Sequence, residues 1–275
     1  MIALRFRLLT VGLGGLLLLA GGLPAGAWGA NGHRVVGQVA ENHLSEKTLR
    51  AIESLLEGDS LARISTWPDF VRSDPAFDFA TAWHYISLEA DEDLDTAERS
   101  PAGDIIVALA RLQADLRNPS SAELTPRQTL AFLVHLIGDL HQPLHVGRRD
   151  DRGGNGVRVT WFGDSRNLHS VWDSAIIDQE RLSYLELSDF IDHPSLGEIE
   201  EWQSTGILDW MEESRQLRET IYSESDDFED DSDTRLSYRY SFQNLPRVEG
   251  RLLKAGVRLA GILNAIFDGD DGGGE

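Results

Sequence analysis

An all-α, single-domain fold is predicted by this sequence, because apolar residues recur every three or four positions along most of the chain. The spacing is clear from Val35 to Val39 and from Ile105 to Leu116, where it places apolar side chains on one face of a helix. The chain has 275 residues, 41% of them hydrophobic, which is enough for one buried core. No internal repeat requires a second domain.

The clearest helix lies between Thr125 and Pro143. Thr125 can cap the first turn, Pro126 fits the first helical position, and Pro143 ends the pattern. A Gly-rich loop over 147–156 follows, and the alternating residues 157–161 predict one small β-hairpin with their neighbours. Apart from such a hairpin we expect helices.

Residues 1–27 have the layout of a secretory signal peptide. Two arginines precede the apolar run from Leu8 to Leu23, and the small residues of 25–27 place the cleavage point between Ala27 and Trp28. The alternative is an uncleaved membrane anchor, but the run is Gly-rich and shorter than the roughly 20 residues that a spanning helix needs. We therefore expect a secreted or periplasmic protein with no membrane attachment after cleavage.

The remaining chain divides into a folded domain over 28–268 and a disordered tail over 269–275. Within the domain, Ser223 to Asp233 is nearly all Ser, Asp and Glu, which indicates a solvated loop. A calcium loop is the alternative for this segment, but the regular Gly-punctuated spacing of an EF-hand is missing.

The composition restricts the partners of this protein. The formal net charge is −21, and removal of residues 1–27, which hold two arginines and no acid, leaves −23. Such a surface repels polyanions and lacks the basic footprint of a duplex DNA binder, so attraction to nucleic acid would have to be local. The sequence has no cysteine, so an exported chain would need another source of stabilisation, such as bound metal.

Two His-x-x-x-Asp pairs are the strongest chemical signal. His135 and Asp139 lie four apart on the predicted helix, and His169 and Asp173 repeat the spacing. Residues four apart share one face of a helix, so each pair can share a metal ion. One such pair is more often a structural hydrogen bond, but two within forty residues are unusual.

Further candidate ligands lie near the pairs. They are His145, His84, Asp69 and His33. Imidazole and carboxylate ligands without thiolate suit zinc in hydrolytic sites. Three other histidines have simpler interpretations: His141 as a hydrogen-bonding group within the motif, and His43 and His193 as surface residues.

These residues, in this order, resemble the S1/P1 nuclease family. The stretch 132–145, Phe-Leu-Val-His-Leu-Ile-Gly-Asp-Leu-His-Gln-Pro-Leu-His, matches the central motif of the family along its length. The mature chain of the family begins with a Trp that binds zinc through its amino nitrogen and carbonyl oxygen. Cleavage after Ala27 would place Trp28 first, with His33 at the matching spacing. The similarity runs from Trp28 through Asp173 and continues as a helical pattern to about Phe267.

The resemblance implies the helical phospholipase C/P1 nuclease-like fold and three zinc ions, with nine ligand positions in three sets. The first set is Asp69, His84, His135 and Asp139; the second is the Trp28 terminus, His33 and Asp139 as a bridge; the third is His145, His169 and Asp173. Because a peptide nitrogen cannot take the place of a free amino group, the precursor should be inactive.

The resemblance also implies the activity, which is hydrolysis of single-stranded DNA and RNA to 5′-nucleotides, and it leaves 3′-nucleotidase activity open. Asp69 would orient or deprotonate the attacking water, and Arg72 would contact phosphate with its fork of donors. Tyr85 would stack on an unpaired base. Simpler alternatives are pairing of Arg72 with Asp74 or another surface acid, and core packing of Tyr85.

Ser174 departs from the family pattern, because fungal relatives often carry Asn at this position to help hold the scissile phosphate. We keep Ser174 as a substrate-binding candidate with altered contacts. Single-stranded nucleic acid and 3′-nucleotides are the expected substrates, no stable protein partner is implied, and a monomer is expected.

Two other functions compete with the nuclease. A zinc-dependent phospholipase C shares the fold and the Trp ligand, but its last ligand tends to be Glu where this chain has Asp173, and no apolar lipid-docking stretch is evident. A zinc-sequestering or structural metal protein would favour four ligands and Cys, whereas the third set has three ligands and an open position.

Overall fold

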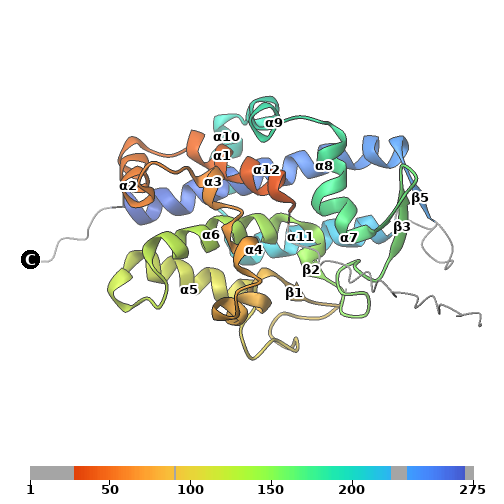
Figure 1. The fold of residues 1–275 in the computed structure, drawn as a ribbon, viewed down its shortest axis with the longest axis horizontal. Helices are drawn as coiled ribbons and strands as arrows, with labels where there is room; N and C mark the ends of the chain where they lie inside the picture. The colour runs from red at the N-terminus through yellow and green to blue at the C-terminus, as the bar shows by residue number, and fades with distance from the viewer. Residues whose placement is uncertain (1–27, 90, 224–233, 270–275) are drawn as a thin grey trace, which may run out of the picture.

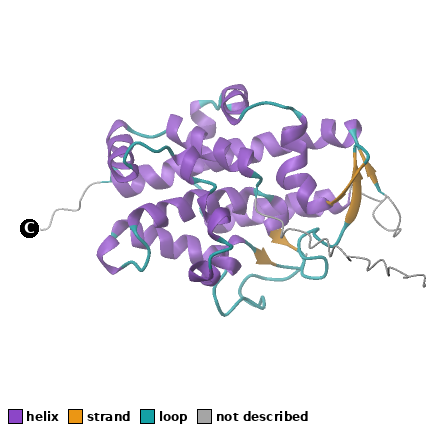
Figure 2. Ribbon diagram, in the orientation of Figure 1, coloured by secondary structure: helices purple, strands orange, loops and turns teal. Residues whose placement is uncertain are grey.

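The computed structural model describes residues 28–89, 91–223 and 234–269. Helices dominate this part of the chain, and of the few short strands the longer ones lie near one end (Figures 1 and 2). The prediction of a mainly α-helical fold is confirmed. The predicted signal peptide and most of the predicted acidic loop and tail lie outside the described residues.

The helices follow one another in chain order: α1 (Ala30–Asn42), α2 (Glu46–Leu56), α3 (Leu61–Ile64), α4 (Trp67–Val71), α5 (Ile105–Arg117), α6 (Pro126–His141), α7 (Leu168–Ser170), α8 (Ile176–Gln179), α9 (Tyr184–Ile191), α10 (Leu196–Gln203), α11 (Ile207–Ser223) and α12 (Tyr238–Phe267). Tighter 3₁₀ turns are η1 (Pro75–His84), η2 (Pro119–Ser121) and η3 (Pro143–His145), and η4 (Val171–Ala175) is a π-helical turn.

Helix α6 is the centre of the structure. Thr125 and Gln128 form a reciprocal capping box at its start, which satisfies backbone donors that the helix itself leaves unpaired. Every residue from Thr129 to His141 is buried, and α6 packs against α5, α12 and α1. A helix apolar on all sides is buried on all sides, so the polar side chains on α6 lie in a low-dielectric interior.

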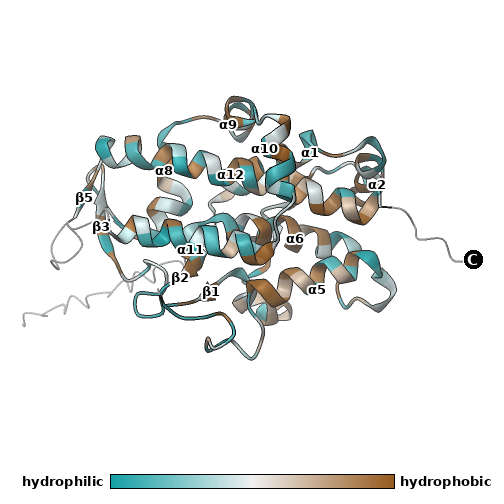
Figure 3. Cartoon of the chain, turned by 180° about the vertical axis from the view of Figure 1, so that it is seen from behind, coloured by the Kyte–Doolittle hydropathy of each residue, from teal (hydrophilic) through white to brown (hydrophobic). Residues whose placement is uncertain are grey.

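Helix α12 runs for 30 residues along α1 and α6. Its buried residues include Val248, Leu252 and Leu259, whereas Tyr238 and Phe242 near its start are exposed. Figure 3 shows hydrophobic and hydrophilic stretches along this helix, as expected where one face packs on the core. Among the helices of the described residues, none combines the length and hydropathy that a bilayer span requires.

The predicted hairpin forms from β3 (Arg158–Trp161) and β4 (Asp164–Asn167), which pair antiparallel. Two pairings were not predicted. Strand β5 (Arg235–Leu236) adds to β3 in parallel, and β1 (Ile86–Ser87) pairs in parallel with β2 (Val146–Gly147). Two-residue strands from distant segments leave no alternating pattern in the sequence, so periodicity could not reveal them.

The β1–β2 pair matters for the site because it joins the segment after His84 to the segment after His145. A buried arginine on α11 holds this junction: Arg218 donates to Leu88 O and to Val146 O, each at 2.6 Å. The described part of the chain thereby places two candidate ligands next to each other although they are 61 residues apart.

Candidate metal centre

Three groups of His and Asp side chains lie together at the centre of the structure. Within each group, the candidate ligand atoms lie within 4.8 Å of one another. The groups are His33, His135 and Asp139; Asp69, His84 and His135; and His145, His169 and Asp173. The structure therefore brings together the eight side chains that the sequence singled out as His and Asp ligands.

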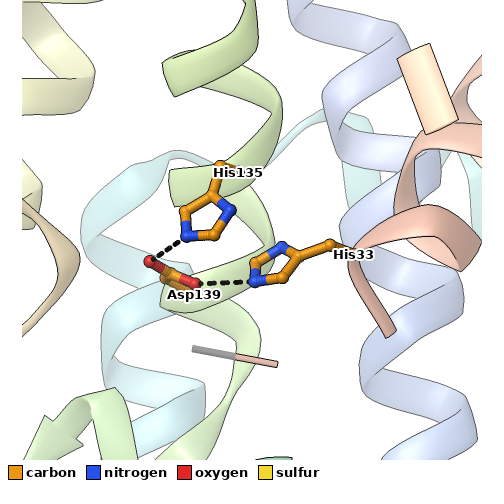
Figure 4. Close-up of side chains that lie close together, drawn as sticks. All are labelled: His33, His135 and Asp139. Carbon is orange, nitrogen blue, oxygen red and sulfur yellow. Dashed lines mark ion pairs between the residues drawn. The ribbon is translucent and has the colours of Figure 1, made fainter. Parts of the chain in front are cut away.

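Helix α6 supplies the pair that links the first two groups. His135 and Asp139 are fully buried, and Nε2 of His135 lies 3.4 Å from Oδ2 of Asp139 (Figure 4). Nδ1 of His135 donates to Ser65 O at 2.7 Å, which directs Nε2 toward the carboxylate. The four-residue spacing thus produces the shared face that it predicted.

His33 reaches the same carboxylate from α1. Its ring stacks on His135 with 3.8 Å between centroids, and its Nε2 lies 3.4 Å from Oδ1 of Asp139 (Figure 4). Gly138 permits this approach, because a Cβ there would lie 2.9 Å from His33 Nδ1. The glycine within the buried helix is therefore a part of the site that sequence analysis did not single out.

Asp69 and His84 complete the second group. Nδ1 of His84 lies 3.0 Å from Oδ2 of Asp139, and Asp69 Oδ1 lies 3.9 Å from Nε2 of His135. Asp69 belongs to the short helix α4 and is partly exposed, whereas His84 ends the turn η1 and is buried. This group therefore opens toward solvent at Asp69.

The third group is connected to the second through the backbone. Nδ1 of His145 donates to His84 O, and Nδ1 of His169 donates to Gly153 O, both at 2.6 Å. The Nε2 atoms of the two rings then face Asp173, at 3.8 Å for His145 and 3.1 Å for His169. Asp173 lies in the π-helical turn η4, a local form that is frequent at functional sites.

Gln142 positions this third group and was missed by sequence analysis. Its side-chain oxygen accepts from Leu144 N at 2.6 Å, and its amide nitrogen donates to Oδ1 of Asp173. Gln142 is fully buried. An amide held by the backbone thus fixes the orientation of the carboxylate. The position of Gln142 in the motif, between His141 and His145, was the sequence signal that could have identified it.

The electrostatics of the cluster favour a bound cation. Burial, with neighbouring histidines, holds the pKa of His33 and of His84 well below the usual value, so both are neutral. Burial lowers the pKa of His145 to about 4. Burial and the nearby Asp69 carboxylate raise the pKa of Asp139. Burial opposes protonation of His169, but the Asp173 carboxylate raises its pKa overall.

Several buried polar atoms at the cluster have no hydrogen-bond partner among the described residues. They are both ring nitrogens of His33, Oδ1 of Asp139, Nε2 of His145 and Nε1 of Trp28. A buried polar atom without a partner costs free energy, and neutral imidazoles and carboxylates are the donor set that zinc prefers. The side chains present therefore fit metal ions.

Trp28 lies beside the cluster. The adjoining Gly29 N donates to Asp173 O at 2.6 Å, and the Trp28 ring would contact a Cβ at Gly138 at 3.6 Å. Ser174 Oγ packs so closely on Gly29 that a Cβ there would overlap it. The start of the described chain is thereby held against η4, and ligation by the Trp28 amino group stays a prediction.

A cleft of about 400 Å³ opens beside the cluster. Its lining includes His84, His145 and His169, together with Arg72 and Tyr85. Tyr85 is 47% exposed, so the alternative of core packing was wrong. Nη1 of Arg72 lies 3.3 Å from Oδ1 of Asp69, so Arg72 contacts an acid of the metal centre, and its role in binding phosphate stays a prediction.

Two further arginines line the cleft and were missed. Arg149 donates to both oxygens of Glu92, and Arg152 has a left-handed backbone with φ of 56°. Both lie in the run Arg148-Arg149-Asp150-Asp151-Arg152, which stands out in a chain with 46 acidic residues. That run was the sequence signal for a local positive potential.

The other histidines lie apart from the three groups. Nδ1 of His141 donates to Ile137 O at 2.8 Å, as predicted for a hydrogen bond within the motif, and its Nε2 lies 3.0 Å from Arg258. His193 is exposed as expected. His43 is part-exposed and pairs with Asp192 at 2.7 Å, a contact that sequence analysis did not predict.

A buried charge network holds the end of α6. Arg251 donates to His141 O at 2.9 Å and to Ser214 Oγ at 2.6 Å, and Ser214 donates to Leu140 O. Glu213 accepts from Arg251 at 2.5 Å and from Arg258 at 2.6 Å. The last carbonyls of α6 are thus satisfied by α11 and α12, directly after the turn that carries Asp139.

A helical scaffold that holds imidazoles and carboxylates in three groups able to bind metal, beside an open cleft lined by arginines, is typical of metal-dependent hydrolases. Comparison with known proteins gives the family. The sequence profile of the S1/P1 nuclease family matches residues 28–268, and the chain belongs to this family. It is therefore a nuclease, a hydrolase of phosphodiester bonds.

Two of the three relatives described next match most of the chain, and the third matches about half of it. Endonuclease 4 of Arabidopsis thaliana is 32% identical over 276 residues, which cover 87% of this chain and 89% of the relative. Nuclease S1 of Aspergillus oryzae is 28% identical over 270 residues, with coverage of 87% and 91%. Nuclease P1 of Penicillium citrinum is 32% identical over 158 residues, with coverage of 54% and 57%.

Proposed function

We propose that this nuclease hydrolyses single-stranded DNA and RNA to 5′-nucleotides and also acts on 3′-nucleotides, with three zinc ions as cofactors. The enzyme would be exported after removal of residues 1–27 and would act as a monomer formed by residues 28–268, with 269–275 as a tail. The observation that carries the proposal is the buried cluster of three ligand groups beside a cleft that holds an exposed tyrosine and arginines.

The zinc ligands would be the three sets predicted from the sequence, with Asp139 shared and Trp28 supplying its amino group. When bound, zinc would supply Lewis acidity to a phosphate oxygen and lower the pKa of water toward neutrality. Asp69, partly exposed at the mouth of the cluster, would orient the attacking water. Arg72, which lies 3.3 Å from Oδ1 of Asp69, would hold the phosphate by a charge-assisted hydrogen bond.

The preference for single strands would come from Tyr85. A base can stack on an exposed aromatic ring only when it is not already stacked and paired within a duplex. Tyr85 is half-exposed in the same cleft as His84 and His145, so a base on its ring would lie beside the metal ligands. Ser174, packed on Gly29, would influence this region through the position of η4.

The test is hydrolysis of single-stranded DNA by protein that starts at Trp28, with and without a chelator. Phosphatidylcholine in a parallel assay distinguishes the phospholipase C alternative. We expect chelator-sensitive cleavage of DNA alone, loss of activity in Asp69→Asn, and normal activity in the matched surface variant Asp78→Asn. Lipid hydrolysis with intact DNA would transfer the chain to the phospholipase function, and zinc-loaded protein that hydrolyses neither would overturn both.

Tyr85→Ala tests the strand preference. We expect its kcat/KM on single-stranded DNA to fall by about 5- to 100-fold, since stacking on an aromatic ring contributes about 1–3 kcal/mol per base. Activity on a 3′-nucleotide should also fall, because the same base would occupy the ring. An unchanged preference for single strands over duplex in this variant would contradict the assignment of Tyr85.

A further inference from the structure

A second recess lies next to the metal centre and shares no lining residue with the cleft of Tyr85. Its volume is about 640 Å³. It is formed by α3, α4 and the start of α6, and its lining includes Arg63, Trp67, Phe70, Arg127 and Gln128. The functions described above do not use these side chains.

Phe70 is the unusual feature of this recess. Its side chain is 80% exposed, although it directly follows the predicted zinc ligand Asp69 on α4. Trp67 on the same helix is partly buried and packs edge-on against Phe77 and Phe132, with centroids 5.2 and 5.6 Å apart. One aromatic ring is therefore held rigidly at the recess, and the other is available to a ligand.

Two arginines and one carboxylate, Asp59, line the recess, so its net charge is positive in a strongly negative protein. Arg127 pairs with Asp59 and donates to Leu56 O at 2.8 Å, so its guanidinium is fixed at the rim. Arg63 is exposed, and its guanidinium contacts no carboxylate among the described residues. With a net charge of −21 on the whole chain, this is a local site for an anion that also offers aromatic surface.

We propose that the recess is a second subsite for single-stranded nucleic acid, which receives a nucleotide adjoining the one at the metal centre. A base would stack on Phe70 and a phosphate would pair with Arg63. The proposal rests on the proposed function. Phe70 lies on α4 directly after Asp69 and two positions before Arg72, which would hold the phosphate. A nucleotide that adjoins this phosphate would lie within reach of the recess.

The combination of groups favours nucleic acid over a lipid. Aromatic rings interleaved with basic side chains are the common means of binding single strands without sequence preference. A lipid surface would instead require a continuous apolar face, whereas Arg63, Arg127, Thr66 and Gln128 surround Phe70 with polar groups.

The experiment compares two substrates, thymidine 3′-monophosphate, which occupies the metal centre alone, and the octanucleotide of thymidine, which extends beyond it. In Phe70→Ala, kcat/KM for the octanucleotide should fall by roughly 5- to 100-fold and that for thymidine 3′-monophosphate by less than about twofold. In Arg63→Glu, octanucleotide cleavage should fall by about 3- to 10-fold, and its dependence on salt should become shallower by about one phosphate contact.

Phe242→Ala and Arg239→Glu are the matched controls, because both residues are exposed at the start of α12, far from α4 (Figure 1). Neither should change the ratio of the two substrates. If the wild type cleaves both substrates and Phe70→Ala leaves the ratio unchanged, the subsite is wrong and the proposed function stands. Loss of binding to phosphatidylcholine vesicles in Phe70→Ala, with an unchanged ratio, would indicate a lipid-docking face instead.

If the wild type cleaves neither substrate, the proposed function fails. The subsite is then tested separately, by measuring how tightly the protein binds an oligonucleotide. The probe is a fluorescein-labelled octanucleotide of thymidine with phosphorothioate linkages, followed by anisotropy. Weaker binding to Phe70→Ala and Arg63→Glu than to the controls would support the subsite, and equal binding would overturn it.

Discussion

Replacement of Glu213 by glutamine should destabilise the protein by about 2–4 kcal/mol. Glu213 is the shared acceptor of Arg251 and Arg258, whose side chains are 7% and 1% exposed. The substitution keeps the shape and one acceptor oxygen but leaves two guanidiniums without a counter-charge. Uncompensated buried charge of this kind typically costs about 3–5 kcal/mol.

The pKa of Glu213 gives a second route to the magnitude. Burial opposes its ionisation, but hydrogen bonds from Arg258 and the charge of Arg251 hold the pKa at about 2, against 4.5 for a free glutamate. At about 1.36 kcal/mol per unit this difference corresponds to roughly 3 kcal/mol. The side chain is 32% exposed, and solvent screening reduces the figure to about 2–3 kcal/mol.

The sign with pH follows from the depressed pKa. The contribution is fully present above pH 4.5 and is lost as the pH falls from 4.5 toward about 2, because protonation of the folded state then removes the charge. Urea unfolding at pH 7 should therefore show the full difference between wild type and Glu213→Gln. At pH 3 the difference should fall to roughly half.

Glu212→Gln is the matched control, since Glu212 is 37% exposed and pairs with Arg215 on the surface of the same helix. We expect it to change the unfolding free energy by less than about 1 kcal/mol. A loss for Glu213→Gln no larger than this control at pH 7, or a difference that grows at pH 3, would refute the assigned role of the network.

Three further predictions concern the metal centre. Gly138→Ala should lower zinc content and reduce nuclease activity at least about tenfold, because its Cβ would lie 2.9 Å from His33 Nδ1. The control is Gly250→Ala, where a Cβ meets open space within α12, and this change should instead raise the free energy of unfolding by about 0.5–1 kcal/mol. Equal behaviour of the two variants would contradict the packing argument. Arg72→Ala should lower kcat/KM by about 100-fold. The free energy of unfolding, measured in urea, should change by less than about 1 kcal/mol, since the pair of Arg72 with Asp69 is partly exposed. Wild-type activity in this variant would show that Arg72 does not bind the phosphate. A chain that retains two residues before Trp28 should bind fewer zinc ions per molecule and be inactive, which metal analysis and the DNA assay check, and full activity would show that the amino group of Trp28 is not a ligand.

The sequence predicted the parts of the site that are local. His135 with Asp139 and His169 with Asp173 each occupy one turn, so their spacing alone places them together. The central helix was predicted from Thr125 to its end because capping residues and proline act on neighbouring positions. The roles of these residues as ligands remain predictions.

The parts that depend on distant segments could not be predicted. The β1–β2 pair, the contact of Gln142 with Asp173 and the network of Glu213 each join positions far apart in the chain. No periodic pattern records such contacts. His43 shows the same limit, since its partner Asp192 is 149 positions away. Likewise, the size of the recess at Phe70 depends on the packing of three helices.

The division between ligands and scaffold has a consequence for biosynthesis. Every predicted ligand lies between Trp28 and Asp173, but the buried guanidiniums that hold the last carbonyls of α6 come from α12, near the end of the chain. A ribosome that has passed Asp173 has made every predicted ligand side chain without the helix that holds the end of α6 in place. Capture of the metal should thus follow synthesis of α12, and a bound ion would mark a chain in which this helix has formed.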